Sequence, residues 1–329
     1  MLPASAIFVL VFAHPDDESM FFLPTIRSLV GAGETVWFLC LTTGGYDGLG
    51  KIREKELERA GKLLGASRVI VRSDNDDGKA ILDHPTKRYD KIIVAAAIRD
   101  SLSKNLRQAS DRNTTFTNAN ANANANTTNS NRHRFVLITF DELGVSGHVN
   151  HIDTYLGVSH LMEEQQQDQR QPQTNDTNYS TTMHKEENKI LLQQEQHQQL
   201  CFVEAWHLES ERNVLSKYVP LLSWIFLVLA LFAPNKYTHT CTFAPFVGSG
   251  CRRNPNPNNT TDNTTTSILR VFRMHNPVLN WKAMATHRSQ FVWYRRLFVI
   301  FSSYTYCNKY ICKKTTIETK QTRPNSKNY

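Results

Sequence analysis

The 329-residue sequence has no uninterrupted apolar stretch as long as the roughly 18 residues that a membrane-spanning helix needs. Its longest apolar segment, residues 219–233, is broken by Pro220 and Ser223. A simple multispan membrane protein is therefore excluded. A buried core helix is the ordinary interpretation of this segment, and a helix that lies in a membrane interface is the alternative.

The sequence also lacks paired cysteines and a secretory signal. None of its six cysteines forms a CxxC pair, and the first apolar run, residues 7–13, has no basic residue ahead of it. That run leads directly into the motif HPDDE, which favours a buried first strand over a signal peptide. We therefore expect reduced thiols in a cytosolic setting.

Charge of one sign is not concentrated in the body of the chain. The sequence has 38 Lys plus Arg against 30 Asp plus Glu, a net charge of +8, and much of the excess lies near the C-terminus. The basic residues there are Lys309, Lys313, Lys314, Lys320, Arg323 and Lys327. We interpret them as a solvated tail and expect no nucleic-acid partner, although anionic lipid would attract the same charges.

Strand-like and helix-like patterns alternate through the first half of the chain. Strands are predicted at residues 7–12, 35–41, 68–71, 135–140 and 200–206, and helices at 19–30, 51–64, 92–102 and 152–162. This alternation predicts an α/β fold with a Rossmann-like, open, mostly parallel sheet and helices on both faces. We expect one domain over residues 1–310 and a basic tail at 311–329.

Three segments of low complexity interrupt this pattern. They lie near residues 113–132, 163–199 and 254–266 and are rich in Asn, Gln, and Asn with Pro and Thr, respectively. None of them has an apolar face to bury, so we predict disordered inserts in surface loops. Such inserts cost little stability because the entropy of loop closure grows only logarithmically with length.

The strongest chemical signal is the motif His14-Pro15-Asp16-Asp17-Glu18, which lies where the first strand should end and a helix should begin. Ligands bind at this edge of open α/β sheets. Two adjacent carboxylates beside an imidazole are costly to crowd together unless a cation neutralises them, and this donor set suits Zn²⁺. The alternative is an Asp-rich helix N-cap beside an incidental histidine.

A second signal, at residues 140–151, follows the strand predicted at 135–140. It contains His148 and His151, which share one face if the helix has already begun, and glycines at 144 and 147 that permit a tight turn. An isolated HxxH motif is weak evidence. After a second strand, however, it can meet HPDDE at the same sheet edge and complete a three-ligand metal site.

These motifs, together with residues 42–53, resemble the LmbE-like family of metal-dependent GlcNAc deacetylases and, within it, the members that act on GlcNAc-phosphatidylinositol. The similarity extends to residues 208–218, which look like the family segment LxSxNVLRKY, with Ser216 where arginine is usual. It also includes residues 284–297, which look like the family ending MxxHxSQxxWFRxL. Apart from the inserts, nearly the whole chain is covered.

The resemblance implies a role for each residue of the two motifs. His14, Asp17 and His151 are expected to be the metal ligands, with Zn²⁺ as the metal. Asp16 is the expected general base. His148 is the residue expected to stabilise the oxyanion or to protonate the leaving amine.

The resemblance also implies a set of substrate contacts, at Arg53, Asp47 and Asp141. Arg53 and the loop around Asp47 should lie at the carboxyl edge of the second strand, where the family contacts sugar and phosphate. For Arg53 the alternative is a solvated side chain at the start of a helix.

The implied reaction removes the N-acetyl group of GlcNAc-phosphatidylinositol and yields GlcN-phosphatidylinositol and acetate, an early step of GPI-anchor biosynthesis. The expected partners are this glycolipid and a membrane surface, at the cytoplasmic face of the endoplasmic reticulum; the sequence identifies no protein partner. Two alternatives remain: a deacetylase of another GlcNAc conjugate, and a noncatalytic membrane-associated homologue.

Overall fold

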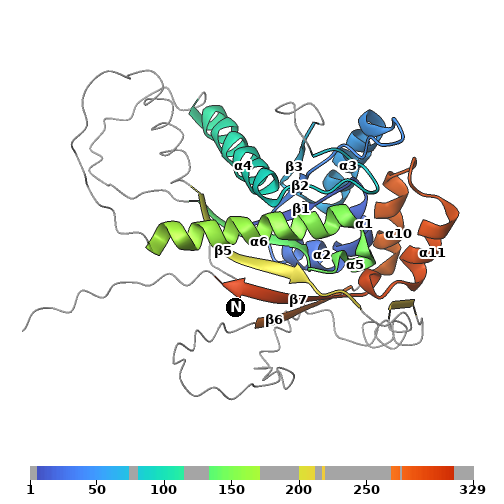
Figure 1. Cartoon of the computed structure of the whole chain (residues 1–329). Helices are drawn as coiled ribbons and strands as arrows, with labels where there is room; N and C mark the ends of the chain where they lie inside the picture. Colours follow the sequence, from blue (N-terminus) through green and yellow to red (C-terminus); the bar gives the residue numbers. More distant parts are fainter. Residues whose placement is uncertain are drawn as a thin grey trace, which may run out of the picture.

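The computed structural model of the chain describes residues 6–73, 81–114, 133–170, 200–211, 217–218, 268–274 and 276–314. Its centre is a seven-stranded sheet with the strand order β3-β2-β1-β4-β5-β7-β6 (Figure 1). The strands are β1 (Ala6–Phe12), β2 (Thr35–Cys40), β3 (Arg68–Val71), β4 (His133–Phe140), β5 (Leu200–Leu208), β6 (Ile268–Arg273) and β7 (Cys307–Lys314).

Strands β1 to β5 run parallel, and β7 is antiparallel to both of its neighbours, β5 and β6. The predicted α/β fold with a Rossmann-like, mostly parallel sheet is therefore confirmed. The pairing of β7 adds residues 311–314 to the sheet, four residues that the sequence placed in the basic tail.

The helices around this sheet are α1 (Asp17–Phe21), α2 (Leu23–Gly31), α3 (Gly50–Leu64), α4 (Lys91–Thr114), α5 (Gly144–Gly147), α6 (Val149–Arg170), α10 (Pro277–Thr286) and α11 (Trp293–Phe301), followed by the 3-10 turn η2 (Ser303–Thr305). One helix was predicted over residues 19–30. The structure divides this region into α1 and α2 because Pro24, which has no N–H to donate, stands in the first turn of a new helix.

Two apolar cores lie on the two faces of the sheet. Successive side chains of β1 point to opposite faces of the sheet and so pack into one core or the other. Because both faces are covered, the strand is apolar throughout. Phe8, Leu10 and Phe12 face a core completed by α2, α3 and α10. Val9 and Val11 face the other core, where α4 and α6 lie side by side (Figure 1). Helices therefore cover both faces, as predicted.

The low-complexity inserts correspond only in part to what was predicted. Helix α6 continues through residues 163–170, so the prediction of a disordered insert is wrong for these eight residues. Gln and Glu are good helix formers, and Gln165 bonds both the N–H and the carbonyl of Phe202 through its side-chain amide. Residues 115–132, 171–199 and 254–266 lie outside the described part of the chain, as does the apolar segment 219–233.

Two further expectations concern thiols and membrane spans. Among the cysteines that the structure describes, Cys40, Cys201 and Cys307 form no disulfide bond. Among the described residues, no helix combines the length and the apolar composition needed to cross a bilayer.

Candidate active site

The two sequence motifs meet at one edge of the sheet. HPDDE follows β1, and the loop 141–148 follows β4, which is the parallel neighbour of β1. The chain order of the strands reverses between β1 and β4, and open α/β sheets bind their ligands at the carboxyl ends of the strands beside such a reversal. The predicted meeting of the motifs is therefore confirmed.

Three imidazoles gather at this edge of the sheet. His14, His148 and His151 can each offer one ring nitrogen so that the three atoms lie within 4.8 Å of one another. His151 lies in the first turn of α6, whereas His148 has an extended backbone one residue before that helix. The three imidazoles thus come from the segments that follow β1 and β4 and converge because these strands are paired.

Asp17 joins two of these imidazoles. Its Oδ1 lies 3.2 Å from His151 Nε2, and its Oδ2 lies 3.6 Å from His14 Nδ1. The same Oδ2 accepts hydrogen bonds from the backbone N–H groups of Ala13 and His14, at 3.2 and 2.9 Å. The carboxylate is consequently fixed in place at the end of β1.

The neighbours of His151 fix its orientation. Its ring stacks on Phe140, with centroids 4.0 Å apart, and its Nδ1 lies 3.1 Å from the carbonyl oxygen of Gly144. Because a carbonyl only accepts, Nδ1 must carry the proton, and Nε2 is left to face the cluster. This outer hydrogen bond is typical of a histidine that binds a metal ion.

The charges of the cluster fit a divalent cation. Burial alone would lower the pKa of His14, but the carboxylates of Asp17 and Asp83 raise it to about 9. Protonated imidazole thus supplies positive charge between buried carboxylates. A metal ion of the zinc type would provide the same compensation, because imidazole nitrogen and carboxylate oxygen are its usual ligands.

Asp16 differs sharply from its neighbour Asp17. Its backbone has a φ of 125°, a conformation that costs a non-glycine residue about 1–3 kcal/mol and is concentrated at functional sites. Burial raises the pKa of Asp16 more than Arg295 and Arg53 lower it. For Asp17, burial is outweighed by His151 and His14, which hold its pKa well below the usual range.

Adjacent carboxyl groups with diverging pKa values serve different purposes. Asp17 stays charged. Asp16 is the better proton acceptor, and its Oδ2 makes no hydrogen bond within the described part of the chain although Arg295 Nη1 lies 2.9 Å away. The roles of metal ligand for Asp17 and general base for Asp16 stay predictions.

His148 is half-buried beside the other two imidazoles. Burial, reinforced by His151 and His14, lowers its pKa to about 4, so it is neutral at pH 7. Its Nδ1 accepts the backbone N–H of Asn150 at 3.3 Å, which leaves the proton on Nε2. A neutral imidazole with Nε2–H can donate to an oxyanion, and this favours that role over protonation of the leaving amine.

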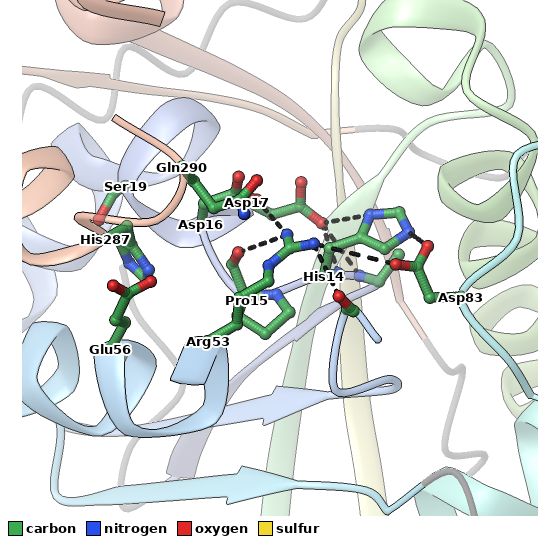
Figure 2. Close-up of polar contacts among 12 residues, drawn as sticks. His14, Pro15, Asp16, Asp17, Ser19, Arg53, Glu56, Asp83, His287 and Gln290 are labelled. Atoms are coloured by element: carbon green, nitrogen blue, oxygen red, sulfur yellow. Dashed lines mark hydrogen bonds and ion pairs between the residues drawn. The ribbon is translucent and has the colours of Figure 1, made fainter. Parts of the chain in front are cut away.

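The C-terminal segment 287–295 braces the HPDDE loop. His287 Nε2 lies 2.6 Å from Glu18 Oε1, and both side chains are fully buried. Glu18 Oε2 accepts the backbone N–H of Asp16 at 3.1 Å. Ser289 donates its N–H and its hydroxyl to Glu56 on α3, at 2.9 and 2.6 Å. Figure 2 shows the His287 and Glu56 side chains beside the HPDDE loop.

Replacement of His287 by alanine is expected to destabilise the fold by about 3–5 kcal/mol, because it leaves the Glu18 carboxylate buried without its partner. Unfolding in denaturant measures the change. The matched control is His160→Ala, which removes a partly exposed ion pair with Glu164 and should cost less than about 1 kcal/mol. Equal costs for the two variants would contradict the bracing role.

The stabilisation of the fold by the His287–Glu18 contact depends on pH. Burial alone would lower the pKa of His287, but contact with Glu18 raises it above its ordinary value. The stabilisation is therefore fully present below that ordinary value and is lost as pH rises through the raised pKa of the folded state. The difference between wild type and His287→Ala should narrow over that range.

Part of the chain matches a known family. Residues 9–162 match the family model described as PIG-L: GlcNAc-PI de-N-acetylase. The chain therefore contains a PIG-L domain. The motifs quoted from the sequence, HPDDE and the HxxH segment, both lie inside this matched region.

The relatives of this chain differ in how much of their length it covers. A Schizosaccharomyces pombe protein named probable N-acetylglucosaminyl-phosphatidylinositol de-N-acetylase is 36% identical over 46% of this chain and 50% of its own length. A Dictyostelium discoideum protein with the same activity in its name is 27% identical, over 92% of this chain and 91% of the relative. A Saccharomyces cerevisiae protein, again with this activity in its name, is 28% identical, over 92% of this chain and 79% of the relative. The chain thus spans about half of the first relative and most of the other two.

The predicted substrate contacts occupy three different settings in this PIG-L domain. Arg53 is buried, and its Nη2 and Nη1 donate to the carbonyls of Pro15 and Gly44 at 2.9 and 3.0 Å (Figure 2). It therefore ties the loops after β1 and β2 together, and it is not a solvated side chain. Gly44 has a φ of 67°, and a Cβ at this position would collide with the guanidinium of Arg53.

The other two predicted contacts lie outside the imidazole cluster. Asp47 is exposed in the loop after β2. Asp141 accepts the N–H and the hydroxyl of Ser210, at 2.7 and 2.5 Å, and so fixes the end of β4 to the end of β5. In this structure Asp141 positions the loop that carries His148.

Sequence reasoning missed several residues of the site. Asp83 Oδ1 lies 3.2 Å from His14 Nε2 (Figure 2), and Asn150 Nδ2 lies 3.0 Å from the same nitrogen. Arg295 reaches Asp16 from α11. Asn150 and Arg295 stand inside quoted motifs, which was the available signal. Asp83 stands in no motif, because only the fold brings its loop to His14.

Proposed function

We propose that the chain is a zinc-dependent hydrolase that removes the N-acetyl group of GlcNAc-phosphatidylinositol and yields GlcN-phosphatidylinositol and acetate. The observation that carries this proposal is the pair Asp16 and Asp17, adjacent carboxyls with opposite pKa shifts beside three converging imidazoles. The names of the relatives support the glycolipid as substrate and GPI-anchor biosynthesis as the setting.

His14 and His151 would hold the metal ion, with Asp17 as the third protein ligand. A bound zinc ion supplies Lewis acidity, which polarises an amide carbonyl and makes a water molecule more acidic. All three side chains are buried, so a metal ion there lies in a medium where its charge acts strongly.

The residues of the chain then divide the proton transfers. Asp16 accepts a proton as the oxygen of water bonds to the acetyl carbon. His148 Nε2–H donates to the oxygen that becomes negative in the tetrahedral intermediate, and the loss of one such donor typically costs about 10²–10³ in rate. The carbon–nitrogen bond breaks, and the sugar nitrogen leaves as an amine with the proton that Asp16 returns.

The proposed cell compartment is the cytoplasmic side of a membrane. Free cysteines and a lipid-linked sugar support the cytoplasmic face of the endoplasmic reticulum membrane, with the membrane surface as a partner. A mobility shift of the cellular protein on endoglycosidase treatment would contradict this location, since glycans are added on the other face.

Acetate release from synthetic GlcNAc-phosphatidylinositol in mixed micelles tests the function. We expect release by the zinc-loaded protein and none after metal chelation. A water-soluble GlcNAc conjugate serves as the second substrate. Faster release from the soluble conjugate would favour the alternative deacetylase, and a zinc-loaded protein that releases no acetate from either substrate would favour the noncatalytic homologue.

A further inference from the structure

The outer face of α11 is apolar although it is exposed. Its exposed side chains are Trp293, Tyr294, Leu297, Ile300 and Phe301, with exposed fractions of 72%, 54%, 46%, 39% and 36%. Their spacing of i, i+1, i+4, i+7 and i+8 places them on one side of a helix. A helix on the surface of a soluble protein normally turns polar residues outward, so this helix has the reverse arrangement.

The inner face of α11 belongs to the active site. Val299 is buried, and Phe298 packs edge-on against Phe21 with centroids 5.5 Å apart. Arg295 Nη1 lies 2.9 Å from Asp16 Oδ2. One short helix therefore has the expected catalytic base on one side and an exposed aromatic stripe on the other. Figure 1 shows α11 beside α10 at the margin of the molecule.

The charged side chains around this exposed face of α11 are all basic. Residues 263–317 contain no Asp or Glu. Three basic side chains are exposed there: Lys282 on α10, Arg288 on the turn after it, and Arg296 on α11. Trp281 on α10, with 39% of its surface exposed, extends the aromatic area. Exposed tryptophan, tyrosine and leucine flanked by Lys and Arg form the composition that binds the interface of an anionic bilayer.

We propose that this face, formed by Trp281, Trp293, Tyr294, Leu297, Ile300 and Phe301 with the flanking basic residues, docks on an anionic lipid bilayer. This proposal rests on the proposed function only for the identity of the substrate, because binding to the bilayer itself requires no substrate. Docking would bring Asp16 to within about one helix diameter, roughly 10 Å, of the headgroups. A sugar attached to a lipid headgroup could then reach the imidazole cluster while the acyl chains of the lipid stay in the bilayer.

Vesicle binding by the whole chain tests this surface. We expect wild-type protein to bind vesicles of phosphatidylcholine with phosphatidylserine more strongly than vesicles of phosphatidylcholine alone, because the flanking charge is positive. Leu297→Glu should lower the partition coefficient by about tenfold or more, because it removes an exposed apolar side chain that would enter the bilayer and adds repulsion from the anionic headgroups. Trp293→Gln should act in the same direction.

The matched control is Leu63→Glu. Leu63 lies in the last turn of α3, away from α11, and its exposed fraction of 41% is close to the 46% of Leu297. It should change vesicle binding by less than about twofold. Thermal unfolding midpoints near that of wild type would show that the variants are folded.

Three outcomes would overturn the docking surface. They are a wild-type protein that does not bind vesicles, a Leu297→Glu variant that binds as well as wild type, and a lipid-free dimer that Leu297→Glu dissociates. The last would identify a second copy of the chain as the true occupant. Binding is measured without substrate, so a chain that binds vesicles but releases no acetate would contradict the proposed function alone.

Discussion

His151→Ala is expected to lose its bound metal and its activity together. The ring of His151 is held by Phe140 and by the carbonyl of Gly144 with Nε2 directed into the cluster, so alanine removes a preorganised ligand. A site with two protein ligands left binds zinc poorly. His14→Ala should behave in the same way. Elemental analysis of the purified variants, paired with acetate release, measures both quantities.

The matched control for this experiment is His133→Ala. His133 is exposed at the start of β4, at the opposite end of the strand from the site, and should keep full metal content. Full metal occupancy in both His14→Ala and His151→Ala would exclude these residues as ligands.

The third ligand is decided by a comparison of two further variants. The family resemblance assigns it to Asp17, whereas the three nitrogens that lie within 4.8 Å of one another belong to His14, His148 and His151. If Asp17 is the ligand, Asp17→Ala loses metal and His148→Ala retains it. The reverse result would make His148 the ligand and leave Asp17 to orient the histidines that it contacts.

Asp16→Asn is expected to lower turnover by about 10² or more while the metal stays bound. Asparagine has nearly the same shape as aspartate but cannot accept the proton. Thermal unfolding and metal content should therefore change little compared with acetate release. Asp100→Asn, at an exposed position on α4, is the matched control and should leave turnover unchanged.

The opposite pattern would reverse the interpretation of HPDDE. In that case Asp16→Asn would release the metal, and Asp17→Asn would retain it and only slow turnover. The strained backbone of Asp16 would then serve to direct a ligand into the metal site, and the low pKa of Asp17 would reflect its contacts with His151 and His14 alone.

Local sequence signals were sufficient for the first half of the fold. Residues 68–71 form β3 as predicted, and α3 ends at Gly65, whose φ of 83° suits a glycine. HPDDE and the HxxH segment could be assigned to one sheet edge because the carboxyl ends of neighbouring parallel strands share that edge. These features depend on residues close together in the chain or on a general property of α/β sheets.

The remainder of the site depends on contacts across most of the chain. His287 and Glu18 are 269 residues apart, and no periodicity or turn signal links them. Arg295 was part of a quoted motif, but its contact with Asp16 follows only from the packing of α11. The antiparallel pairing of β6 and β7 was not predicted, because β6 follows a long segment of low complexity and two helices, α10 and α11, separate it from β7.

The separation between His287 and Glu18 has a consequence for biosynthesis. The HPDDE loop leaves the ribosome early, whereas the histidine that pairs with Glu18 and the arginine that reaches Asp16 are translated near the end of the described chain. Loop closure over such a distance is slow compared with local folding. During synthesis the HPDDE loop therefore lacks these contacts, and the site can be completed only after α10 and α11 have emerged.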